Sequence, residues 1–80
     1  MRAAQMKELK ILVVDDDPGV LEVLDGYLAG QGCAVATSRS GQQALEALRR
    51  DPPELMLSDI EMAGMNGFEL LKEARKRYPQ

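Results

Sequence analysis

The chain has 80 residues, of which 45% are hydrophobic and 29% are charged, and its formal net charge at pH 7 is -3. This composition is typical of one small globular domain and excludes a disordered or collagen-like chain. A chain with a negative net charge does not attract the negatively charged phosphates of a nucleic acid, so we expect no nucleic-acid binding by this segment. The sequence holds no histidine and one cysteine, Cys33, which excludes histidine-based catalysis and an internal disulfide.

Residues 1–9 form a polar leader without the apolar run of a secretion signal. No stretch of the sequence approaches the length of a membrane span. Together with the lone cysteine, these features predict a cytoplasmic protein without a membrane partner.

The first predicted strand leads directly into a run of acidic residues. Residues 11–14 are apolar and mostly β-branched, and the run is too short for a helix, so we expect a strand buried on both faces. Asp15, Asp16 and Asp17 follow at once. Asp17 precedes Pro18 and is predicted to be the N-cap of a helix that begins at the proline. Negative charge is therefore expected at the carboxyl end of the strand, where open α/β sheets bind ligands.

The helix after these acids is predicted from apolar residues at helical spacing, and Gly30 and Gly32 are expected to end it. Its apolar residues are Val20, Leu21, Leu24, Tyr27 and Leu28. A short second strand is expected over residues 33–37. Ser40 and Gln43 match a capping box at the start of a second helix. The apolar stripe of that helix is Ala44, Leu45, Ala47 and Leu48.

Two prolines at residues 52–53 end the second helix, and residues 55–58 form the third predicted strand. Asp59 stands at its carboxyl end. A loop over residues 60–65 leads to a third helix, predicted over residues 66–78. The apolar side of this helix is predicted to consist of Phe68, Leu71 and Ala74. Strands that alternate with helices in this way predict a parallel sheet with right-handed crossovers.

Three carboxylates are expected to converge if the first and third strands are neighbours. The carboxyl ends of both strands then bring Asp15, Asp16 and Asp59 to one rim of the sheet. Oxygen ligands without a histidine or thiolate suit Mg²⁺, and one of the acids would be free to attack phosphorus.

Structural roles also account for these acids. Asp17 is a helix cap on its sequence context alone. Asp15 and Asp16 are favourable charges near a helix N-terminus, and Asp59 fits an ordinary turn. The residues by themselves leave both interpretations open.

Three ordered segments of residues 10–78 resemble the receiver domain of bacterial two-component response regulators. Residues 11–18 match its acidic first strand end, and residues 41–45 are similar to the start of its second helix. Residues 59–67 are similar to its phosphoacceptor loop, Asp-x-x-Met-Pro-x-Met-Asp/Asn-Gly, although Ala63 replaces the proline. The resemblance implies an α/β flavodoxin-like half-domain with three helices and three parallel strands in the order 2-1-3.

The resemblance also implies roles for individual residues. Asp59 would accept a phosphoryl group from the phosphohistidine of a sensor histidine kinase. Asp16 would bind Mg²⁺ directly, Asp15 through water, and the main-chain carbonyl of Glu61 would be the third protein ligand. The chain would then be a signalling module rather than a turnover enzyme.

Residues 10–80 match only the N-terminal portion of the family's domain, so we expect a truncated receiver domain. Its fourth and fifth strands and helices, with their hydroxyl residue and lysine, have no counterpart here, and phosphorylation is expected to be slower. Lys72 is an unlikely substitute and is expected to be solvated. The third strand would have an open edge, which predicts a homodimer through that edge or through an uncovered helix face.

Two other functions remain open on the sequence. A half-receiver that is not phosphorylated would act as a dimerisation or interaction module. A haloacid dehalogenase-type phosphatase has Asp-x-Asp at the end of its first strand, a spacing that Asp15 and Asp17 fit. Pro18 and Gly19 disfavour it, because that family has Gly-Thr/Val there.

Overall fold

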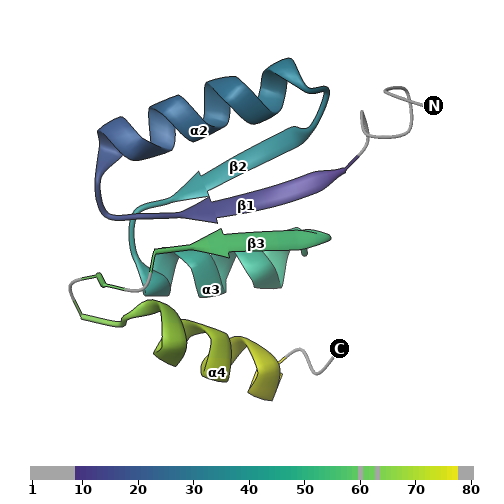
Figure 1. Ribbon diagram of the computed structural model, residues 1–80. Coiled ribbons are helices and arrows are strands. Elements are labelled where there is room, and N and C mark those ends of the chain that lie inside the picture. The colour runs from purple at the N-terminus through teal and green to yellow at the C-terminus, as the bar shows by residue number, and fades with distance from the viewer. Residues whose placement is uncertain (1–8, 60, 63, 78–80) are drawn as a thin grey trace.

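The computed structural model describes residues 9–59, 61–62 and 64–77, which form three strands and three helices in alternation (Figure 1). The elements are β1 (Lys10–Val14), α2 (Pro18–Gly30), β2 (Ala34–Ser38), α3 (Gly41–Arg50), β3 (Leu55–Ser58) and α4 (Gly67–Arg77). The sheet is parallel in the order β2-β1-β3, as predicted. Val14 pairs with both Ser38 and Ser58, so all three strands end level. Tyr78 and most of the polar leader lie outside the described residues.

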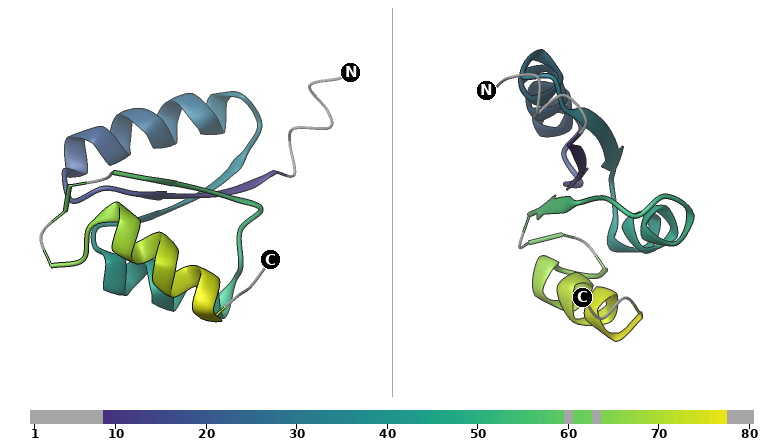
Figure 2. Two further views of the ribbon diagram at one scale, coloured as in Figure 1. Left: turned by 60° about the horizontal axis from the view of Figure 1, so that its bottom comes forward. Right: turned by 90° about the vertical axis from the view of Figure 1, so that its right-hand side faces the viewer.

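The sheet separates two layers of helices. α2 covers one face, and α3 and α4 cover the other (Figure 2). Successive side chains of a strand point to opposite faces. Leu12 and Val14 therefore pack with α3 and α4, whereas Ile11 and Val13 pack with α2. All four side chains are at most 3% exposed, which confirms that β1 is buried on both faces.

Side-chain caps fix where α2 and α3 begin. The Asp17 carboxylate accepts a hydrogen bond from the backbone N–H of Gly19 at 2.9 Å. Ser40 Oγ accepts one from the N–H of Gln43 at 3.1 Å. In a capping box, Gln43 would accept a second hydrogen bond from the N–H of Ser40. Here Gln43 Oε1 accepts it from the N–H of Arg39, one residue earlier, at 2.8 Å. Both predicted helix starts are confirmed.

α4 begins at a cap that was not predicted, and its buried face differs from the sequence prediction. Asn66 and Glu69 form a reciprocal capping pair with two bonds of 2.9 Å. Leu70 is fully buried and Ala74 packs beside it, but Phe68 and Leu71 are 67% and 44% exposed. The predicted apolar side was therefore wrong for these two residues, because α4 turns Leu70 toward the core instead.

The predicted apolar stripe of α2 is also only partly buried. Leu21 is buried, and Leu24 and Leu28 are partly buried against the same cluster. Val20 and Tyr27 are exposed, because α2 packs mainly against β1 and β2 and these two side chains point away from the sheet. No described helix is long and apolar enough to cross a bilayer.

A salt bridge links the start of β1 to the end of α3. Lys10 Nζ lies 3.0 Å from an Asp51 carboxylate oxygen. This hydrogen bond and the attraction between the two charges raise the pKa of Lys10. Both side chains are exposed, so the pair contributes little to stability.

Adjacent leucines of α4 provide a direct test of this packing. Leu70→Ala leaves a cavity in the core, and we expect it to lower the free energy of unfolding by about 2–5 kcal/mol. Leu71→Ala removes an exposed side chain, and we expect a change of about 0.5 kcal/mol. Urea unfolding followed by circular dichroism measures both. Equal losses for the two variants would contradict the orientation of α4.

Candidate functional site

The carboxyl ends of β1 and β3 hold two acidic residues side by side. The strands end level at Val14 and Ser58, and the next residues continue the backbone pairing. The N–H of Asp59 donates to the carbonyl of Val14 at 2.9 Å, and the N–H of Asp15 donates to the carbonyl of Ser38 at 3.1 Å. The backbones of both aspartates are therefore fixed by the sheet.

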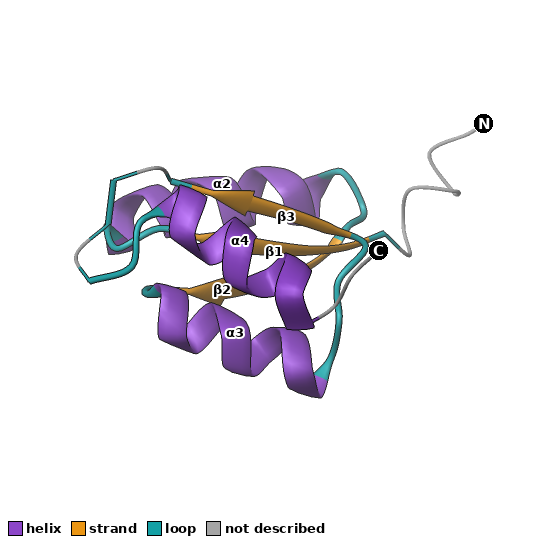
Figure 3. Cartoon of the chain, turned by 90° about the horizontal axis from the view of Figure 1, so that it is seen from below, coloured by secondary structure: helices purple, strands orange, loops and turns teal. Residues whose placement is uncertain are grey.

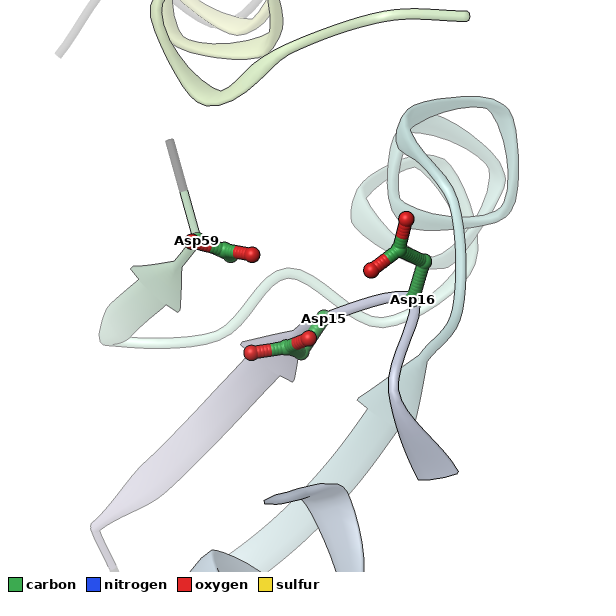
Figure 4. Close-up of side chains that lie close together, drawn as sticks. All are labelled: Asp15, Asp16 and Asp59. Atoms are coloured by element: carbon green, nitrogen blue, oxygen red, sulfur yellow. The ribbon is translucent and has the colours of Figure 1, made fainter. Parts of the chain in front are cut away.

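Three carboxylates converge at this rim, as the sequence predicts. One oxygen from each of Asp15, Asp16 and Asp59 lies within 4.8 Å of the others. Figure 4 shows Asp15 at the end of β1, Asp59 at the end of β3, and Asp16 on the segment that leads to α2. Asp15 is half-buried, and the other two are exposed. An all-oxygen group of this size fits a hard cation such as Mg²⁺.

Asp17 does not belong to this group. Its carboxylate caps α2, as described above, and its own N–H donates to Oδ1 of Asp15 at 3.0 Å. The structural interpretation of Asp17 is thus confirmed. The Asp15 and Asp17 pair that a haloacid dehalogenase would need is replaced by Asp15, Asp16 and Asp59.

The loop after Asp59 is attached to the core by methionines. Met62 is buried among the residues that α3 and α4 contribute, and Met65 packs against the same cluster. Glu61 is exposed, and its predicted role as a metal ligand stays a prediction. Ala63, which stands where the family has proline, lies outside the described residues.

Gly41 permits the contact of Met65 with α3, a role that the sequence did not reveal. A Cβ at Gly41 would lie 2.7–2.9 Å from three side-chain atoms of Met65, closer than van der Waals contact allows. Gly41 is buried at the first position of α3. Glycine forms helices less well than alanine. A glycine at the start of a predicted helix was therefore the signal in the sequence that a side chain has no room at this position.

The comparisons with known proteins agree with the geometry. Residues 11–80 match the family model of the response regulator receiver domain. The chain is 45% identical over 69 residues to the DNA-binding transcriptional regulator NtrC of Escherichia coli K12. This match covers 86% of the chain and 15% of NtrC. The chain is also 44% identical over 66 residues to the DNA-binding response regulator MtrA of Mycolicibacterium smegmatis. This match covers 82% of the chain and 29% of MtrA.

Solved structures share the fold. The response regulator TrrA of Thermotoga maritima, solved in complex with Mg²⁺-BeF, has a TM-score of 0.85 at 36% identity, over 90% of this chain and 63% of that one. The N-terminal domain of a response regulator receiver protein from Methanoculleus marisnigri JR1 has a TM-score of 0.84 at 40% identity. The match covers 86% of this chain and 56% of that one. The chain thus spans less than two thirds of each of these proteins.

Substitution of Gly41 tests whether Met65 holds the loop. Gly41→Ala forces an overlap with Met65, and we expect it to lower the free energy of unfolding by about 1–3 kcal/mol. Gly26→Ala is the matched control. Nothing lies within 4 Å of its Cβ position, so we expect a gain of about 0.5–1 kcal/mol.

A second background makes this test specific. In Met65→Gly, all three overlapping side-chain atoms are removed, and the cost of Gly41→Ala should disappear, as measured by urea unfolding of the four proteins of the cycle. An equal cost in both backgrounds would show that Met65 does not fill the space beside Gly41.

Proposed function

The chain belongs to the response regulator receiver domain family, and on this basis we propose that it is a phosphoacceptor module in which Asp59 receives a phosphoryl group from the phosphohistidine of a sensor histidine kinase. The observation that carries the proposal is the position of Asp59 within the carboxylate group. Asp59 is exposed at the end of β3, so a macromolecular donor can reach it. A cytoplasmic location fits this role and is part of the proposal.

The chemistry needs one nucleophilic carboxylate. An oxygen of Asp59 attacks phosphorus while the P–N bond of the phosphohistidine breaks, and the imidazole nitrogen leaves with the electron pair. The N–H of Asp59 is held by the carbonyl of Val14, which keeps the backbone of the nucleophile fixed. The product is an aspartyl phosphate on the chain.

The same residues are suited to hold Mg²⁺. We assign direct binding to Asp16 and Asp59, binding through water to Asp15, and a main-chain carbonyl ligand to Glu61. When bound, the ion would offset the charge of the carboxylates and of the incoming phosphoryl group. TrrA, whose fold matches this chain, was solved in complex with Mg²⁺-BeF, which supports this assignment.

The module would transfer one group rather than turn over a substrate. Family membership and the capping role of Asp17 both disfavour the haloacid dehalogenase alternative. Lys72 is exposed on α4, as expected.

An interaction module is the second candidate function. Leu55 and Leu57 of β3 are 46% and 38% exposed in the part of the chain that the structure describes, and exposed apolar side chains favour association. This role does not require modification of Asp59.

Phosphorylation is tested by the intact mass of the chain after incubation with Mg²⁺ and acetyl phosphate. We expect one added phosphoryl group that depends on Mg²⁺ and is absent in Asp59→Asn. Asp17→Asn is the matched control, because asparagine caps helices as well as aspartate, and it should be phosphorylated like the unchanged chain. The proposal is wrong if the folded chain gains no phosphoryl group, or if Asp59→Asn gains one equally.

A further inference from the structure

The backbone pairing at the rim places a basic residue, Arg39, beside Asp15. The three strands run side by side with β1 in the middle (Figure 3), and they end level. The next residues along the chain are Arg39 after β2, Asp15 after β1 and Asp59 after β3. The N–H of Asp15 donates to the carbonyl of Ser38 at 3.1 Å, which extends the pairing of β1 with β2 by one step. Arg39 and Asp59 therefore flank Asp15 on its two sides.

This arrangement brings the side chain of Arg39 within reach of the carboxylate group. Residues that stand abreast on parallel strands share a face of the sheet, and the carboxylates of Asp15 and Asp59 meet at the rim accordingly. Neighbouring strands lie about 4.8 Å apart. Arg39 is thus one strand spacing from Asp15 and two from Asp59, and an arginine side chain is long enough to extend across the end of β1.

The backbone of Arg39 is held in place, whereas its side chain is available to a ligand. The N–H of Arg39 donates to Oε1 of Gln43 at 2.8 Å, which ties the residue to the first turn of α3. The side chain of Arg39 is exposed. None of the ion pairs between described residues involves it. A positive charge is therefore anchored at the rim and is not neutralised there by an ion pair with a described residue.

The surroundings of Arg39 are otherwise acidic. Among the described residues that directly follow the three strands, namely 15–17, 39–40, 59 and 61, five are acids and Arg39 is the one base. A phosphoryl donor is itself an anion, so these acids repel it as it approaches. A bound Mg²⁺ ion would offset part of this repulsion. A positive charge beside Asp15 offsets more of it, and this charge belongs to the chain.

We propose that Arg39 binds the incoming phosphoryl group and so determines how well the chain uses anionic phosphodonors. The inference rests on the proposed function of Asp59 and names a further residue of the same site. A guanidinium group presents several N–H groups in a fixed plane, and it forms charge-assisted hydrogen bonds with two phosphate oxygens at once. Arg39 contacts the phosphoryl oxygens from the β2 side of the rim, and Asp59 attacks phosphorus from the β3 side.

The charge of Arg39 has opposite effects on the two ligands of the rim. It attracts the anionic phosphodonor, and it repels Mg²⁺. A neutral residue at position 39 should therefore weaken the binding of the donor and strengthen the binding of Mg²⁺. A purely structural role of Arg39 predicts a different result, because a disturbed rim would bind both ligands less well.

The rate of phosphorylation by acetyl phosphate, followed by intact mass at saturating Mg²⁺, tests the contact with the donor. We expect Arg39→Gln to lower the rate at low donor concentration about two- to fivefold, the range of an exposed charge pair. The rate at saturating donor should not change. Arg39→Lys keeps the charge and should keep most of the rate. The difference between the variants should vanish in about 1 M salt, where the Debye length is about 3 Å.

The affinity for Mg²⁺ alone is the second readout, measured by nuclear magnetic resonance titration. Arg39→Gln should bind Mg²⁺ about two- to fivefold more tightly than the unchanged chain. Arg50→Gln is the matched control. It makes the same change of charge at the exposed last residue of α3, at the end away from the rim, and should alter neither quantity. The hydrogen bond of Arg39 to Gln43 uses its backbone N–H, so the substitutions at position 39 should leave the fold intact.

The outcomes separate this inference from the proposed function. A folded chain that gains no phosphoryl group contradicts the proposed function, and the inference with it. Phosphorylation of Arg39→Gln at the unchanged rate would overturn the role of Arg39 alone. Weaker binding of Mg²⁺ by Arg39→Gln would do the same, since it would indicate a disturbed rim. An Arg39→Lys variant as slow as Arg39→Gln would also overturn it, because the positive charge would then not be the cause.

Discussion

The parallel pairing of β1 with β3 is the constraint on which the fold and the site both depend. Parallel strands end at the same rim, and here they end level at Val14 and Ser58. The residues that follow, Asp15 and Asp59, must then lie together. The strength of this arrangement comes from the buried apolar residues of β1, which lie between two layers of helices. An apolar core thus holds carboxylates close together although their negative charges repel each other at this distance.

The rim uses its acids for two different purposes. Asp17 and one oxygen of Asp15 satisfy backbone N–H groups where α2 begins, and these bonds fix the path of the chain as it leaves β1. Asp16 and Asp59 are more exposed and can meet a cation or a phosphoryl donor. The caps of α2 are therefore part of what positions the site, although Asp17 itself is outside the carboxylate group.

Local signals in the sequence predicted much of this arrangement. Element order and both caps follow from patterns within about ten residues of each other. The convergence of the three acids also required β1 and β3 to be neighbours, a strand order that the family resemblance implied. The buried face of α4 was not predictable in this way, because Leu70 and Leu71 are equally apolar and tertiary packing alone chooses between them. The contact between Gly41 and Met65 joins residues far apart in the chain, so it required the structure.

The most direct test of the central claim, a metal site at the rim shared by β1 and β3, is nuclear magnetic resonance with Mn²⁺ as a paramagnetic substitute for Mg²⁺. We predict that the amide signals of Asp15, Asp16 and Asp59 broaden first and that excess Mg²⁺ restores them. Asp16→Asn should lose this broadening, and Asp17→Asn should keep it. Broadening centred on other acids, or equal broadening in Asp16→Asn, would contradict the account.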